Sequence, residues 1–192
     1  GIYAYLKEAY SAGGCQAFDW EYMAGIFEHP FEVLLTDTLP ESKDAPKAIG
    51  GHMTGCRIGF DAGGSDRKVS AVIDGEAVYS EEVVWFPKTN SDPDYHYEGI
   101  VAALKSAASH LPRVDAVGVS SAGIFINNRT MSASLFLKVP KDLYDSKVKD
   151  IYIRAITDTF GPIPYCVVND GDVTALAGAM SLKTNSVLGI AM

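Results

Sequence analysis

The sequence is poor in cysteine and in basic side chains, and each shortage excludes a class of protein. It has three cysteines in 192 residues, Cys15, Cys56 and Cys166, with no C-x-x-C pair and no cysteine–histidine spacing of a zinc site. This pattern predicts free thiols in a reducing compartment rather than a disulfide framework or a zinc knuckle. Lys and Arg number 16 against 24 Asp and Glu, a formal net charge of −8. Nucleic acid is therefore not expected as the main partner, because phosphate backbones are bound by clustered cations.

Long apolar runs, internal repeats and low-complexity segments are also missing from the sequence. No apolar stretch is long enough to span a membrane, and no basic segment followed by an apolar run opens the chain. We therefore expect a cytoplasmic protein with no membrane partner. A length of 192 residues suits one well-filled domain and leaves little room for two.

Two parts of the chain differ in their residue pattern. Residues 1–55 are predicted to form a helical extension and linker, because apolar spacing typical of helices is followed by a stretch rich in Pro, Gly, Ser and Lys. In detail, the pattern predicts helices over residues 2–11 and 16–29, a short strand at Leu34-Leu35 and a loop over residues 40–54. Residues 56–192 are predicted to form a separate α/β domain.

The α/β part begins with three strands joined by tight turns and then alternates helices with strands. We expect a mixed five-stranded sheet of order βββαβαβα with helices on both faces. The predicted sheet strands span residues 57–61, 68–74, 76–86, 114–119 and 165–168. The predicted helices span residues 95–111 and 141–160 and a third segment from Asp170 to Leu182. Further strands are predicted at residues 124–127, 132–137 and 187–192.

The turn after the first sheet strand has the composition of a phosphate site. Backbone N–H groups of Gly63 and Gly64 can approach an anion closely, Ser65 can donate a hydrogen bond, and Lys68 or Arg67 can supply charge. Asp61 can hold Mg²⁺, since magnesium binds a few carboxylates together with water and substrate phosphates. Taken alone, the same residues more often form a plain hairpin turn with solvated charges.

Polar turns also follow two later strands, and ligands in open α/β sheets collect at such strand ends. Ser121 and Gly123 follow the fourth strand, where they can line a ligand pocket. Asn169 and Asp170 follow the fifth, where a partly desolvated carboxylate can take a proton from a substrate hydroxyl. Helix capping by Asp170 or by Asp172 is the plainer interpretation of the same residues.

These motifs, in this order, resemble those of the ROK-type sugar kinases, which belong to the sugar-kinase, heat-shock-protein and actin superfamily. Residues 61–65 resemble the first phosphate motif, D-x-G-G-T, with Ser in place of Thr, and Asp66 stands where the family usually has lysine. Residues 167–178 resemble the V-x-N-D-A-N-A-A-A-L-x-E block. Residues 121–123 lie where these kinases have a Pro-Gly turn beside the sugar. Residues 187–192 look like the strand that leads into the second phosphate motif.

The resemblance implies a fold, an activity and a set of roles. The fold would be the ribonuclease H-like amino-terminal lobe of a two-lobed, actin-like ATPase, and the activity ATP-dependent phosphorylation of a sugar hydroxyl. The implied site comprises Asp170 as catalytic base, Asn169, Ser121 and Gly123 beside the sugar, Gly63, Gly64, Ser65 and Lys68 at the ATP phosphates, and Asp61 at Mg²⁺. The second lobe would lie beyond Met192, so these residues alone are expected to be inactive or nearly so.

Two alternatives and the oligomeric state stay open at this point. Sugar-sensing transcriptional regulators resemble these kinases but carry a DNA-binding helical domain in front, and the acidic opening helices of this chain suit DNA poorly. Some ATPases of the superfamily activate a partner enzyme through a cysteine-held iron–sulfur cluster, which three scattered cysteines do not favour. A homodimer is compatible with the sequence.

Overall fold

The computed structural model describes residues 1–42, 51–184 and 186–190, and the chain divides into two compact units, residues 1–48 and 49–192. The first unit contains two helices, α1 (Ile2–Ala9) and α2 (Ala17–Phe27). Both helices confirm the expectation from apolar spacing. After α2 the chain folds back, since the Trp20 indole Nε1 donates to the Phe31 carbonyl oxygen at 3.0 Å.

The short strand predicted at Leu34-Leu35 is wrong. Both side chains are exposed, and no regular structure forms there. Two leucines without a neighbouring strand to pair with do not make a sheet. The predicted loop over residues 40–54 lies partly in residues 43–50, which are outside the described residues.

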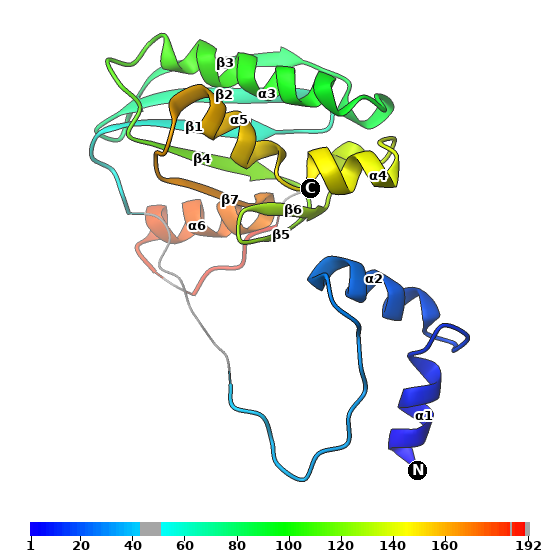
Figure 1. The fold of residues 1–192 in the computed structure, drawn as a ribbon. Helices are drawn as coiled ribbons and strands as arrows, with labels where there is room; N and C mark the ends of the chain where they lie inside the picture. Colours follow the sequence, from blue (N-terminus) through cyan, green and yellow to red (C-terminus); the bar gives the residue numbers. More distant parts are fainter. Residues whose placement is uncertain (43–50, 185, 191–192) are drawn as a thin grey trace. The chain divides into compact units, whose positions relative to one another are not determined.

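The second unit is built on a mixed five-stranded sheet of order β3-β2-β1-β4-β7 (Figure 1). Strands β1, β2 and β3 pair antiparallel in sequence, whereas β4 and β7 run parallel to β1. The strands are β1 (Cys56–Ala62), β2 (Asp66–Ile73), β3 (Glu76–Val84), β4 (Ala116–Ser121) and β7 (Tyr165–Asn169). The predicted mixed five-stranded sheet with flanking helices is confirmed.

Turn chemistry explains the hairpin formed by β2 and β3. Asp74 and Gly75 join β2 to β3 with positive φ angles of 51° and 89°. Two successive residues of positive φ match the right-handed twist of the flanking strands, and Asp-Gly is a favoured pair for such a turn. The sequence therefore fixes this hairpin locally.

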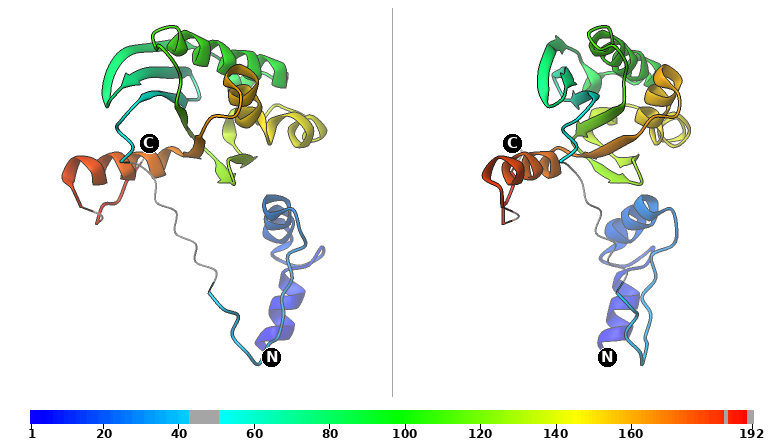
Figure 2. Two further views of the ribbon diagram at one scale, coloured as in Figure 1. Left: turned by 60° about the vertical axis from the view of Figure 1, so that its left-hand side comes forward. Right: turned by 90° about the vertical axis from the view of Figure 1, so that its left-hand side faces the viewer.

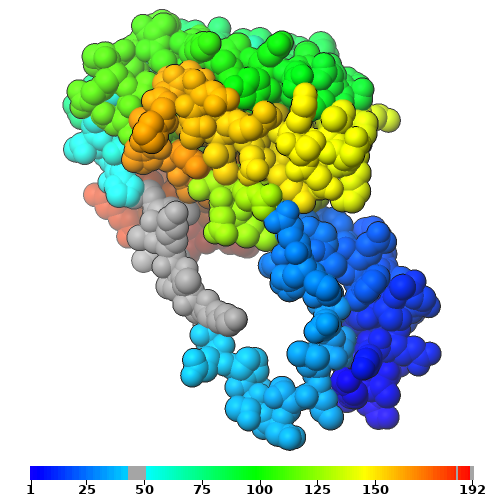
Figure 3. Space-filling model, viewed as in Figure 1, coloured from blue at the N-terminus to red at the C-terminus, as the bar shows by residue number. Residues whose placement is uncertain are grey.

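One face of the sheet is covered by helices α3 (Pro93–Ala108) and α5 (Ile151–Phe160) (Figures 1 and 3). Alternate residues along the strands are buried and pack against one face of each helix. The buried residues are Ile58, Phe60, Val69, Val117, Val119 and Val167 from strands, and Ile100, Leu104, Ile151 and Ile156 from helices. On the opposite face, Gly59 of β1 and Gly118 of β4 are in register and exposed. Figure 2 shows α6 (Asp170–Leu182), which follows β7, lying apart from α3 and α5. None of the helices in the described part of the chain is long and apolar enough to cross a membrane.

A small hairpin between β4 and α5 differs from the prediction. Strands β5 (Ile124–Ile126) and β6 (Arg129–Ser132) pair across Asn127 and Asn128, which have φ angles of 53° and 67°. The first strand agrees with the sequence, but the second begins earlier than expected. The strand predicted over residues 132–137 is wrong, because Ser134–Phe136 forms a 3-10 turn.

The helix predicted over residues 141–160 is interrupted. It consists of a short turn, α4 (Lys141–Leu143), a π-helical segment (Tyr144–Val148) and α5. The Lys149 carbonyl accepts a hydrogen bond from the Thr130 N–H at 2.8 Å, so β6 engages a group that a continuous helix needs for its own ladder.

The strand predicted over residues 187–192 is not formed in the part that the structure describes. Residues 186–190 have no regular structure, and Ala191 and Met192 lie outside the described residues. Instead, the segment packs on α6. A Cβ at Gly189 would meet the Ala175 backbone, which shows how closely the two backbones approach.

Candidate functional site

Three polar strand ends meet at one edge of the sheet. Because β1, β4 and β7 run parallel, their carboxyl ends lie at the same edge (Figure 1). The register pairs Asp61 with Ser120, and it pairs Ser121 with both Ala62 and Asn169. The three turns singled out by the sequence are therefore neighbours in the fold, as expected for a site at parallel strand ends.

The glycine turn between β1 and β2 is held by Trp85. This buried indole donates from Nε1 to the Gly63 carbonyl at 2.8 Å and to the Asp66 carbonyl at 3.0 Å, while the Trp85 N–H donates to the Ser65 carbonyl at 3.1 Å. The carbonyl groups of the glycine turn are thus hydrogen bonded to Trp85 on one side of the turn. Within the described residues, the N–H groups of Gly64 and Ser65 donate to no other residue. The turn presents unpaired N–H groups, as an anion-binding turn does.

The charged side chains of this turn are mostly paired with each other. The Lys68 ammonium lies 2.5 Å from Asp66 Oδ1, and the Ser65 hydroxyl donates to Asp66 Oδ2 at 3.3 Å. The hydrogen bond from Lys68 lowers the pKa of Asp66, and the same bond raises the pKa of Lys68. Lys68 and Ser65, both predicted at a phosphate, thus direct their polar atoms to Asp66.

Replacing Lys68 with methionine is expected to raise the pKa of Asp66 toward its ordinary value, because the hydrogen bond that stabilises the carboxylate is lost. In the native protein the lowered pKa of Asp66 stabilises the fold at pH values above the ordinary carboxyl pKa. Lys68→Met is expected to lose this pH-dependent stabilisation. Carboxyl ¹³C chemical shifts recorded across a pH titration measure the change. Lys105→Met, an exposed change in α3, is the control, and an unmoved Asp66 titration in Lys68→Met would contradict the assignment.

Ser121 is not open to a ligand. Its side chain is 1% exposed, donates to the Ala62 carbonyl at 3.3 Å and accepts from the Tyr152 hydroxyl at 3.2 Å. Burial raises the pKa of Tyr152, which keeps the phenol neutral and able to donate. Ser121 therefore joins the ends of β1 and β4 to α5.

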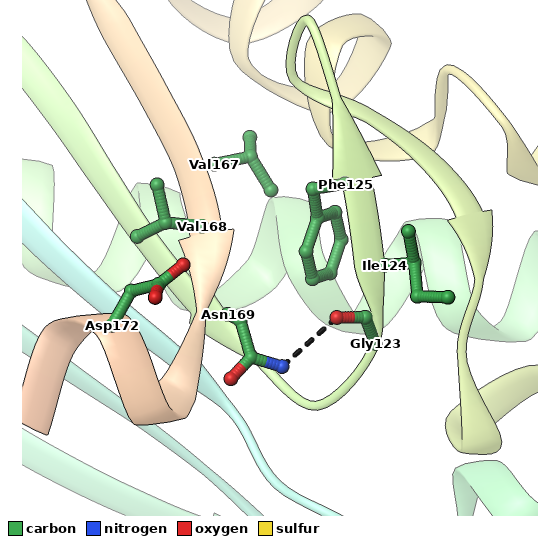
Figure 4. Close-up of a pocket in the computed structure, with 7 residues that line it drawn as sticks. All are labelled: Gly123, Ile124, Phe125, Val167, Val168, Asn169 and Asp172. Carbon is green, nitrogen blue, oxygen red and sulfur yellow. Dashed lines mark hydrogen bonds between the residues drawn. The ribbon is translucent and has the colours of Figure 1, made fainter. Parts of the chain in front are cut away.

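A pocket of about 280 Å³ lies between the β5 hairpin strand and the end of β7 (Figure 4). It is lined by Gly123, Ile124, Phe125, Val167, Val168, Asn169 and Asp172. The Asn169 side chain crosses its floor, donating from Nδ2 to the Gly123 carbonyl at 2.9 Å and accepting from the Gly171 N–H at 2.8 Å. Asn169 is therefore both the N-cap of α6 and a brace between the pocket walls.

The two carboxylates at the start of α6 differ in position. Asp170 and Asp172 both lie in its first turn, where the helix dipole favours negative charge. Asp172 lines the pocket, and Asp170 is not among the residues that do so. Asp170 Oδ1 accepts a hydrogen bond from the Gly171 N–H at 3.0 Å.

Sequence reasoning missed two residues that shape the site. The Asn128 side chain accepts from the Val167 N–H at 2.9 Å and so ties the hairpin to β7. Asparagine tolerates the positive φ that this turn requires, but that tolerance does not indicate the bond to Val167. The ammonium of Lys88 lies against Gly64, and no sequence pattern connects residues so far apart.

The residues present fit Mg²⁺ and ATP phosphates. The described residues contain no cluster of three or more His, Cys, Asp or Glu side chains able to hold a metal ion alone. Magnesium needs only one or two protein carboxylates when phosphates and water complete its shell, and Asp61 stands at the end of β1 opposite Lys68 and Ser120. Unpaired N–H groups at Gly64 and Ser65 suit phosphate oxygens.

Comparison with known proteins finds similarity in structure but not in sequence. No family model matches the chain, and no curated protein matches it. Several similar solved structures are sugar kinases of the ROK family. They include the inorganic polyphosphate/ATP-glucomannokinase of Arthrobacter sp. strain KM (25% identity, 66% of this chain and 48% of that chain, TM-score 0.49). Another is the ROK hexokinase of Thermus thermophilus (20% identity, 65% of this chain and 38% of that chain, TM-score 0.48). A third is the glucokinase of Parabacteroides distasonis ATCC 8503 (20% identity, 68% of this chain and 35% of that chain, TM-score 0.47). The chain spans less than half of the length of each.

Proposed function

We propose that this chain is the amino-terminal lobe of an ATP-dependent sugar kinase of the cytoplasm. The observation that carries the proposal is the meeting of a glycine turn, a small pocket and a carboxylate-bearing helix start at the carboxyl ends of β1, β4 and β7. Phosphoryl transfer depends mainly on positioning and on charge stabilisation, which such an edge can supply.

The pocket beside Asn169 is the proposed sugar site. Its apolar wall, Phe125 and Val168, suits the carbon face of a sugar ring, while Asp172 and the Asn169 amide offer partners for hydroxyl groups. The brace from Asn169 to Gly123 fixes the separation of the two walls before a ligand enters. We assign sugar contacts to Gly123 and Asn169, whereas Ser121 acts behind the pocket by joining strands.

Asp170 is the proposed general base. Its Oδ1 is engaged by the Gly171 N–H, so Oδ2 is the atom that we assign to accept the proton of the reacting hydroxyl. After transfer, the proton stays on Asp170 until solvent removes it.

The glycine turn is the proposed phosphate site. Gly64 and Ser65 direct N–H groups toward phosphate oxygens, and Gly63 keeps the turn narrow, because a Cβ there would lie 2.7 Å from the Asp66 carbonyl. Asp61 would hold Mg²⁺, which offsets negative charge on the phosphates when bound.

The direct test is an assay of the native protein that carries this sequence, with ATP, Mg²⁺ and a panel of hexoses and N-acetylhexosamines. Release of ADP that depends on one sugar, with the phosphorylated sugar identified by mass spectrometry, supports the proposal. ATP turnover independent of every sugar, or no turnover by the intact protein, would overturn it. No feature of the described residues favours the regulator or the iron–sulfur alternative.

A further inference from the structure

Lys88 lies beside the glycine turn although it is distant from it in sequence. It belongs to the 3-10 turn Pro87–Thr89, between β3 and α3. A Cβ built on Gly64 would lie 2.5 Å from Lys88 Cε and 2.6 Å from Lys88 Nζ. The end of the lysine side chain therefore occupies the space directly over Gly64.

The backbone that carries Lys88 is fixed on both sides. Trp85, three residues earlier, is 1% exposed and is hydrogen bonded to the glycine turn itself. Pro87 is buried, and its carbonyl lies 2.9 Å from Nε2 of the fully buried His96. These anchors place residue 88 at the turn independently of any charge on its own side chain.

The ammonium of Lys88 is also available for a ligand. Its side chain is exposed, and within the described residues it forms no hydrogen bond or ion pair. Lys68 differs in this respect, because it pairs with Asp66 at 2.5 Å and lies 4.0 Å from Glu82. Of these two lysines, Lys88 is the one whose charge is not already offset.

We propose that Lys88 is a phosphate-binding residue, completing an anion site with the N–H groups of Gly64 and Ser65. An oxyanion over Gly64 would meet two backbone donors and one ammonium, the donor set that holds a phosphate oxygen. Identifying the ligand as a phosphate of ATP rests on the proposed function, whereas binding of a polyphosphate anion does not. The absence of a side chain at residue 64 then has a reason, because it leaves room for both lysine and anion.

Binding can be tested on the 192-residue chain by ¹H–¹⁵N NMR titration with inorganic triphosphate and with ATP and Mg²⁺. We expect both probes to shift the amide signals of Gly64 and Ser65. Lys88→Ala should weaken triphosphate affinity about 10- to 100-fold, the range for a charge-assisted hydrogen bond. Lys105→Ala, an exposed lysine change in α3, is the matched control and should leave affinity unchanged.

A second variant tests the geometry. Gly64 has no positive φ, and the three atoms nearest to an added Cβ all belong to the flexible end of Lys88, so Gly64→Ala should fold and push the ammonium aside. We expect Gly64→Ala to weaken binding in the native background and to have a smaller effect in Lys88→Ala, since coupled residues are not additive. Equal effects in the two backgrounds would show that Gly64 and Lys88 act separately and would contradict the proposal.

The outcomes separate this proposal from the kinase assignment. Triphosphate binding that depends on Lys88, without sugar phosphorylation by the native protein, supports the anion site and contradicts the proposed kinase function. Sugar phosphorylation with anion affinity unchanged in Lys88→Ala supports the kinase and overturns the role of Lys88. Loss of affinity in Lys68→Ala but not in Lys88→Ala transfers the role to Lys68. Absence of any shift at Gly64 and Ser65 with either probe also overturns the proposal.

Discussion

Asp170→Asn is expected to lower kcat for sugar phosphorylation by about 10²- to 10⁴-fold, the contribution typical of a positioned general base. An amide has nearly the shape of a carboxyl group but cannot take the proton of the attacking hydroxyl. The Michaelis constant for the sugar should change little, because the pocket is lined by other residues. Steady-state kinetics of the intact native protein measure both constants.

Asp172→Asn is the matched comparison, since it removes a charge from the same helix turn. Asp172 lines the pocket, so we expect this variant to raise the Michaelis constant more than it lowers kcat. If Asp170→Asn retains native kcat and Asp172→Asn loses it, the base is Asp172. If both retain native kcat, neither carboxylate is the base.

Gly123→Ala is expected to destabilise the fold by about 1–3 kcal/mol, as overpacking of a filled site does. An added Cβ would lie 2.5 Å from the Ser132 carbonyl oxygen and 2.9 Å from the Ala133 Cβ. The turn would have to move away from β6, which also disturbs the Asn169 bond to the Gly123 carbonyl. Urea unfolding followed by circular dichroism gives the change in free energy.

Gly118→Ala, in β4 before the same turn, provides the control. No atom lies within 4 Å of a Cβ placed there. Replacing a glycine of ordinary extended backbone reduces the freedom of the unfolded chain, so this variant should be stabilised by about 0.4–1 kcal/mol. Equal unfolding midpoints for the two variants would contradict the close contact described for Gly123.

The sheet was predictable because its signals are local. Asp74-Gly75 marks a tight hairpin, and the apolar runs of β4 and β7 mark the parallel strands, of which β4 lies inside the sheet and β7 at its edge. Apolar spacing likewise predicted α3 and the two helices of the first unit. These elements are consistent with their own sequence before any tertiary contact forms.

The errors lie where distant contacts override a local pattern. The helix predicted over residues 141–160 breaks because the Thr130 N–H takes the carbonyl of Lys149. The strand predicted over residues 187–192 is absent from residues 186–190, where Gly189 packs on α6 instead. Neither partner is visible in the spacing of the residues concerned.

The site was predictable as a set of turns but not as a set of contacts. Parallel strand order brings the turns near Asp61, Ser121 and Asn169 together, which the βα alternation implied. Their side-chain partners depend on packing: Ser121 turns inward to Tyr152, and Lys88 arrives from the end of β3. The catalytic and binding roles of the predicted residues stay predictions until the variants above are measured.

The double use of Asn169 constrains how this protein can evolve. One amide uses its donor on the pocket wall and its acceptor on the first turn of α6. An aspartate at this position would keep the cap but place a carboxylate oxygen against the Gly123 carbonyl oxygen, so that two acceptors would face each other. A serine would keep the cap, but its side chain would be too short to contact Gly123. Selection for a wider pocket at this residue would therefore also loosen the helix that carries the catalytic candidate, so a change of substrate range is expected to arise in the β5 wall, at Ile124 or Phe125.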